Sequence, residues 1–232
     1  MALIKLTAIV DNISGKLNGT VFAKNKGGHY MRSKSMPSNP RSTFQTAVRA
    51  RFGAIAQLWG ALTQAQRNAW NAMASEFPYT NRLGDTKILS GFALHQKLNT
   101  NLAVIGQNPL SAPPQPVSPQ AVIRLEVSAS QQERELMLSG EMTSGAIGVD
   151  TDVVVMATPP LRDGVDNFDT QLREIGVIEA GELRTGTNVM DLYAARFGSI
   201  QQKQKIGVSV HTVAVNSGIA SAAVNASTIV EA

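Results

Sequence analysis

The chain has 232 residues, of which 43% are hydrophobic and 16% are charged, and it contains no cysteine. This composition is that of a folded protein with room for two modest domains, and it excludes disulfides, a thiolate nucleophile and cysteine-ligated zinc. The net charge of +4 is unevenly spread: residues 1–52 hold nine Lys/Arg and one acid, whereas residues 121–232 hold eight Lys/Arg and fourteen Asp/Glu. We expect a cationic front and a mildly acidic body with different partners.

Membrane and secretion signals are missing from the sequence. It has no run of about twenty apolar residues, and its start lacks the order of a secretory signal. We therefore expect a soluble protein that is made in the cytoplasm and has no membrane partner.

Residues 1–40 predict an extended basic β-hairpin arm. Two β-rich runs, Thr20–Lys24 and His29–Ser33, flank a turn whose Gly27 and Gly28 supply the positive φ that a tight hairpin requires. Further turn signals lie upstream, at Ser14-Gly15-Lys16 and Asn18-Gly19.

The arm has few large apolar side chains from which to build a core. We expect it to add strands to a neighbouring subunit or to lie on a partner surface. The alternative is a small sheet that packs on the helices of its own chain.

Residues 41–108 predict a helical domain. Ser42 and Gln45 fit a capping box, and Thr63 and Gln66 fit a second one that begins another helix. The first helix has an apolar stripe that we expect to face a core, consisting of Phe44, Val48, Phe52, Ile55, Trp59 and Leu62. The second helix has an apolar face that consists of Ala69, Trp70, Met73 and Phe77.

The short connection between these two helices predicts a helical hairpin, and Pro78 ends the second helix. A third helix is predicted from the cap Ser90 to near Gly106. Its apolar positions are Phe92, Leu94, Leu98 and Leu102.

Residues 109–120 form a proline-rich linker, because prolines crowd this stretch and cannot serve a helix interior or a central strand. Beyond the linker, residues 121–232 predict short antiparallel strands of an immunoglobulin-like or fibronectin-III-like β-sandwich. The predicted strands are Ala121–Ala129, Arg134–Glu141, Asp152–Thr158, Glu174–Glu179, Lys205–Val215 and Ile219–Val230. One helical insertion is predicted at Thr187–Phe197. The predicted fold class is therefore α+β.

No catalytic or metal-binding pattern stands out, so we expect no enzyme activity and no cofactor. The histidines His29, His95 and His211 lie far apart in the sequence, and each is expected to be a surface residue or to pair with a neighbouring group instead of binding a metal. Asp163, Asp166 and Asp169 do not have the spacing of a calcium-binding loop and predict a solvated loop.

The basic arm is the candidate for function. Its cations could contact an acidic protein surface or a nucleic acid, and we favour a protein because no nucleic-acid-binding fold accompanies them. The expected partner-binding residues are Lys16, Lys24, Lys26, Tyr30, Arg32, Lys34, Arg41, Arg49 and Arg67. Arg67 has a second interpretation, since it could also reach a helix end.

The order of motifs from Asp11 to Ala74 resembles an uncharacterised family encoded by tailed bacteriophages and prophages. The resemblance rests on Ser14-Gly15-Lys16, Gly27-Gly28 with Arg32, Asn39-Pro40 with Gln45 and Arg49, and a core of Trp59, Leu62, Thr63, Gln66, Arg67 and Trp70. In this core we expect Trp59 and Trp70 to clamp the helical hairpin and Thr63 and Gln66 to cap its second helix.

The resemblance implies a structural protein of the virion, present in many copies or as a homo-oligomer. We expect a capsid-associated or decoration protein that binds other virion proteins through its basic arm and helices. Two alternatives remain open: a component of the tail or neck, and a phage DNA-binding protein.

Overall fold

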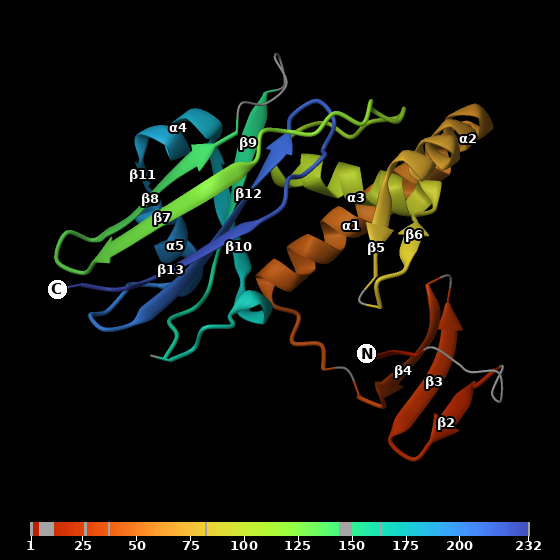
Figure 1. Cartoon of the computed structure of the whole chain (residues 1–232), viewed down its shortest axis with the longest axis horizontal. Coiled ribbons are helices and arrows are strands. Elements are labelled where there is room, and N and C mark those ends of the chain that lie inside the picture. The colour runs from red at the N-terminus through yellow and green to blue at the C-terminus, as the bar shows by residue number, and fades with distance from the viewer. Residues whose placement is uncertain are drawn as a thin grey trace.

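A computed structural model of the chain describes residues 2–4, 12–25, 27–36, 38–81, 83–143, 150–162 and 164–231. The fold is mixed α+β: an N-terminal antiparallel sheet is followed by helices and then by C-terminal antiparallel sheets (Figure 1). The α+β class predicted from the sequence is confirmed at this level.

The N-terminal sheet has four strands in the order β1-β4-β3-β2. These are β1 (Ala2–Ile4), β2 (Gly15–Leu17), β3 (Thr20–Asn25) and β4 (Gly28–Ser33). The predicted hairpin is confirmed, since β3 pairs with β4 from Thr20↔Ser33 to Asn25↔Gly28.

Two details of the predicted arm are wrong. The positive φ of the hairpin turn belongs to Gly28 (115°) and not to Gly27. Gly15 lies in β2 instead of a turn, and its φ of 118° lets the strand start there. The sequence did not predict β1 or β2. Such short strands form only through pairing, of β1 with β4 and of β2 with β3, and local turn residues do not reveal that pairing.

The helices follow the predicted order. They are α1 (Thr43–Ala61), α2 (Gln64–Met73) with the 3₁₀ turn η1 (Ala74–Glu76), and α3 (Gly91–Val104). A hairpin of β5 (Pro78–Thr80) and β6 (Thr86–Ile88), which the sequence did not predict, connects α2 to α3. Both α1 and α2 pack against α3 and make little contact with each other, so the predicted helical hairpin of α1 and α2 is wrong. Their shared core centres on Trp70, Ala74, Leu94 and Leu98.

The expectation that the whole apolar stripe of α1 faces a core is wrong. Ile55 is buried, but Phe44, Val48 and Phe52 have exposed fractions of 49%, 57% and 53%. Periodicity identifies the apolar side of a helix, but it does not reveal how far along that helix a partner extends. The first half of α1 therefore presents an open apolar row.

The C-terminal part contains two antiparallel sheets. One has the order β11-β8-β7 and the other the order β10-β9-β12-β13. Their strands are β7 (Val122–Ser130), β8 (Glu135–Met142), β9 (Thr151–Ala157), β10 (Arg173–Glu179), β11 (Thr187–Asn188), β12 (Lys205–Ala214) and β13 (Val224–Ile229). A 3₁₀ turn, η2 (Asp169–Gln171), precedes β10. One cluster of buried side chains, including Leu138, Val155 and Val208, joins residues of both sheets.

The strand predictions are confirmed except at the last one. Residues Ile219–Val230 were expected to form one strand, but β13 begins only at Val224, because the chain first turns at Gly218 and makes an isolated bridge between Val213 and Ala220.

The predicted helix Thr187–Phe197 begins later, as α5 (Met190–Phe197). Thr187 and Asn188 instead pair with β8, and the Asn188 side chain accepts a hydrogen bond from the Met190 N–H at 2.9 Å. A further helix, α4 (Ala180–Thr185), was missed.

The helical part and the C-terminal part touch directly, in addition to their proline-rich connection. Asn101 of α3 donates to the Gly218 carbonyl at 2.8 Å, and Arg51 of α1 pairs with Glu174 of β10 at 3.3 Å. A side chain at Gly218 would collide with the Leu98 carbonyl, since its Cβ would lie 2.3 Å away. Glycine is therefore required for α3 to approach this turn.

Candidate interaction surface

The N-terminal sheet has no core of its own among the described residues. From residue 12 to residue 54, each described side chain is half-buried or exposed, and Ile55 is the first buried one. Leu17 and Met36 are 69% and 91% exposed. In Figure 1 the sheet lies below the helices and apart from the C-terminal sheets. The described side chains of the sheet are therefore at most half-buried, and part of their surface is accessible to a partner.

Strand register divides the predicted partner-binding residues between the two faces. Lys16 is aligned with Val21 and Arg32 across β2, β3 and β4, and Tyr30 lies on the same face beside Ala23. Lys24 is aligned with His29 on the opposite face. The structure thus places Lys16, Tyr30 and Arg32 on one face, and two strand spacings put the Cα atoms of Lys16 and Arg32 about 10 Å apart.

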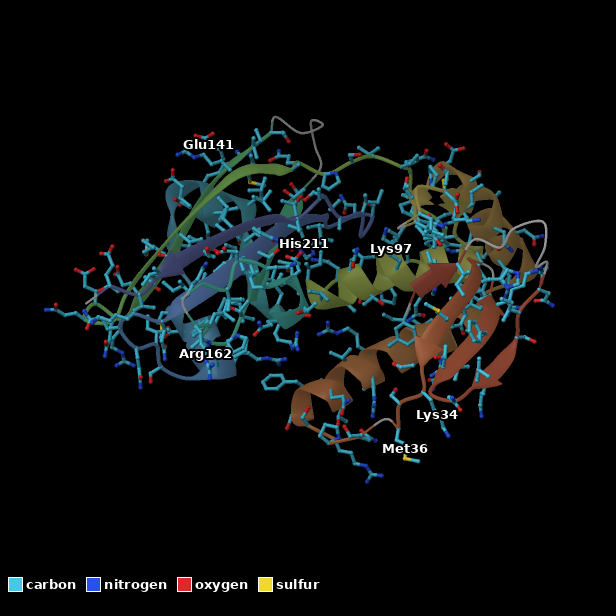
Figure 2. The ribbon with its side chains drawn as sticks, turned by 60° about the horizontal axis from the view of Figure 1, so that its bottom comes forward. Lys34, Met36, Lys97, Glu141, Arg162 and His211 are labelled. Atoms are coloured by element: carbon cyan, nitrogen blue, oxygen red, sulfur yellow. The ribbon has the colours of Figure 1, made fainter. Side chains whose placement is uncertain are left out.

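The remaining predicted cations lie on the path from the sheet into the helices. Lys34 and Arg41 are exposed, and Arg49 on α1 donates to the Asn39 side chain at 2.8 Å. Figure 2 shows Lys34 and Met36 on this connecting segment. Lys26 lies outside the described residues.

Arg67 belongs to the helices and not to the basic surface. Its guanidinium donates to the Gly60 carbonyl at 2.8 Å, in the last turn of α1. Of its two interpretations, the structure therefore favours contact with a helix end over contact with a partner.

The two tryptophans of the motif are connected through a buried histidine. His95 of α3 makes edge contacts with Trp59 and Trp70, whose ring centroids lie 5.3 and 5.1 Å from its own. Trp70 also donates its indole N–H to the Ser111 carbonyl at 3.0 Å. The expectation that His95 lies at the surface is wrong, because this packing leaves it only 1% exposed.

The predicted caps differ in completeness. Thr63 and Gln66 form a full capping box, with the Thr63 N–H donating to Gln66 Oε1 at 2.8 Å and the Gln66 N–H to Thr63 Oγ1 at 3.3 Å. Ser42 accepts from the Gln45 N–H, but Gln45 Oε1 has no hydrogen-bond partner among the described residues.

Acidic side chains gather on the C-terminal part. Asp152 lies near Asp150, and it is aligned with Glu179 across the β9–β10 pair. Its pKa is raised mainly by burial and further by the negative charges of Glu179 and Asp150. In the predicted solvated loop, Asp166 pairs with Lys205 at 2.8 Å and Asp169 accepts from Asn225 at 2.8 Å, whereas Asp163 lies outside the described residues.

Within the described ranges, no three His, Cys, Asp or Glu side chains form a group that could hold a metal ion. Nor is any described helix long and apolar enough to cross a membrane.

Compared with models of known protein families and with curated proteins, the sequence matches none. Function is therefore inferred from the residues of the chain itself.

Proposed function

We propose that the protein is a non-enzymatic structural protein of a bacteriophage particle, made in the host cytoplasm and attached to the shell as a capsid-associated or decoration protein. The observation that supports attachment is a folded sheet without any buried side chain among its described residues. A sheet without a core of its own gains stability when a second surface covers it. The virion setting rests on the resemblance of residues 11–74 to the phage family.

The charge on the sheet favours an acidic protein partner. Lys16 and Arg32 share one face, and Lys34 and Arg41 are exposed on the segment that leads from the sheet to α1. The short outer strand β2 leaves one backbone edge open for an added strand. Many copies on a lattice would sum such modest contacts into stable attachment.

In this proposal the C-terminal sheets form an immunoglobulin-like or fibronectin-III-like sandwich. With β7, β8 and β11 taken as strands A, B and E, and β10, β9, β12 and β13 as C′, C, F and G, the strand orders match that architecture. The linker of residues 109–120 would carry this sandwich on the outside of the shell.

Charge reversal on the sheet tests the proposed attachment. Particles that lack the protein are mixed with purified Lys16→Glu/Arg32→Glu protein and sedimented, and bound protein is quantified. We expect occupancy to fall about tenfold or more, because two attractive contacts per copy become repulsive. The control is Arg162→Glu/Lys203→Glu, which reverses two exposed cations of the C-terminal part and should bind like the wild type.

Unchanged occupancy of the Lys16→Glu/Arg32→Glu protein, with a wild-type circular dichroism spectrum, would refute attachment through the sheet. Imaging of labelled particles separates the sites on the virion: label over the whole shell supports decoration, and label at one vertex supports a tail or neck component.

A DNA-binding role is the second candidate, and the grouping of Tyr30 with Lys16 and Arg32 favours it. Tyr30 lies next to Arg32 along β4, and an aromatic ring on the same face as two cations can stack on a base while the cations contact phosphates. This role predicts duplex or single-strand binding that weakens steeply with salt in a gel-shift series.

A further inference from the structure

An open groove lies between α1 and α3. It encloses about 460 Å³, and the side chains on its two walls include Phe52 of α1 and Phe92, Gln96, Lys97 and Thr100 of α3. Both phenylalanines are large apolar side chains that remain exposed, Phe52 at 53% and Phe92 at 39%. Exposed aromatic pairs of this kind are typical of interaction sites.

The apolar row of α1 extends the groove toward the start of the helix. Val48 and Phe44 lie one and two turns before Phe52 and are similarly exposed. In the described part of the chain, the Arg196 guanidinium stacks on the Phe44 ring at the far end of the row, 3.4 Å from the ring centroid. An open apolar path therefore runs from Val48 to Phe92.

The walls of the groove carry positive charge only. The α1 and α3 sequences contain Arg49, Arg51 and Lys97 but no Asp or Glu. Arg51 is already paired with Glu174 and Arg49 donates to the Asn39 side chain, which leaves Lys97 on the groove wall for an occupant. Figure 2 shows Lys97 on α3. This charge favours an acidic segment.

Two polar atoms beneath the groove have no hydrogen-bond partner in the described part of the chain. Gln96 is 5% exposed and donates to the Phe52 carbonyl at 2.9 Å, but its Oε1 is unpaired, as is Thr100 Oγ1 one turn later. Both atoms are fully buried, so they belong to the floor of the groove and are not contact points for an occupant.

We infer that this groove binds an acidic segment of a partner protein. An apolar side chain of the segment packs between Phe52 and Phe92, and its carboxylates face Lys97. The inference rests on the proposed function and adds to it the kind of partner segment that binds between α1 and α3.

Fluorescence anisotropy with labelled peptides tests this inference on the full-length protein. The probes are ELELELE, KLKLKLK and ESESESE, which separate the effect of charge from that of apolar side chains. We expect ELELELE to bind at least about tenfold more tightly than either other peptide, since only it matches both features of the groove. Phe52→Ser should weaken ELELELE about tenfold or more, the loss expected for one buried aromatic contact. Lys97→Glu should weaken ELELELE and strengthen KLKLKLK.

Ile88→Ser is the matched control, because Ile88 is 60% exposed and lies on β6, away from the groove walls. It should bind ELELELE like the wild type, and thermal unfolding should show that the variants stay folded.

Equal affinity for ELELELE and KLKLKLK, or no binding of ELELELE, would overturn the inference. So would concentration-dependent self-association that Phe52→Ser abolishes, since a second copy would then fill the groove. The Lys16→Glu/Arg32→Glu particle assay probes a different surface, so the proposed attachment and the groove can fail independently.

Discussion

At the scale of single residues, His95 is a titratable group placed where charge is unfavourable. It lies buried between Trp59 and Trp70, its Nδ1 has no hydrogen-bond partner in the described chain, and burial lowers its pKa below the ordinary 6.5. The unfolded chain therefore takes up this proton at a higher pH than the folded chain. The free energy of unfolding should fall as the pH drops through 6.5 toward the lowered pKa, and it should be independent of this group above that range.

We predict that His95→Phe makes the free energy of unfolding less dependent on pH below 6.5. The phenyl ring keeps the edge contacts and removes the proton, so at pH 7.5 stability should stay within about 1.5 kcal/mol of the wild type. Urea denaturation between pH 5 and 8 measures both the pH dependence of the free energy of unfolding and its value at pH 7.5. A slope should remain, because burial also lowers the pKa of His211. A pH dependence identical to that of the wild type would show that His95 is not held neutral.

At the scale of elements, the two caps predicted by the same sequence pattern should differ in energy. Thr63 completes a reciprocal capping box on α2, whose Trp70 is fully buried. Ser42 makes only one of the two hydrogen bonds of a capping box, at the start of α1. The first turns of α1 keep their apolar side chains exposed. We predict that Thr63→Ala costs about 1–2 kcal/mol and Ser42→Ala about 0.5 kcal/mol or less, since a fraying start contributes little to global unfolding. Urea unfolding compares them, and equal losses would contradict this account.

At the scale of the whole molecule, the N-terminal sheet should be the least stable part of the isolated chain. The helical and C-terminal parts have buried clusters around Trp70 and Val155, whereas the sheet contributes no buried side chain among its described residues. We predict that brief trypsin digestion cleaves at Arg32, Lys34 or Arg41 first and leaves a folded fragment that begins near residue 42. Mass spectrometry identifies the cut sites. Protection of residues 12–41 in the isolated protein would contradict the proposed need for a partner.

The sequence by itself determined most elements and the basic charge of the front. Caps at Ser42, Thr63 and Ser90, the Asn25–Gly28 turn and the alternation in β12 are local signals, so they were readable without the fold. Only the tertiary structure decided which surfaces remain open. The exposure of Phe52 and Phe92 depends on how the helices pack. Strand register decides whether Lys16 and Lys24 share a face. The contact of Arg67 with the Gly60 carbonyl depends on how α2 lies against the end of α1. These are contacts between distant segments, and local residue patterns carry no information about them.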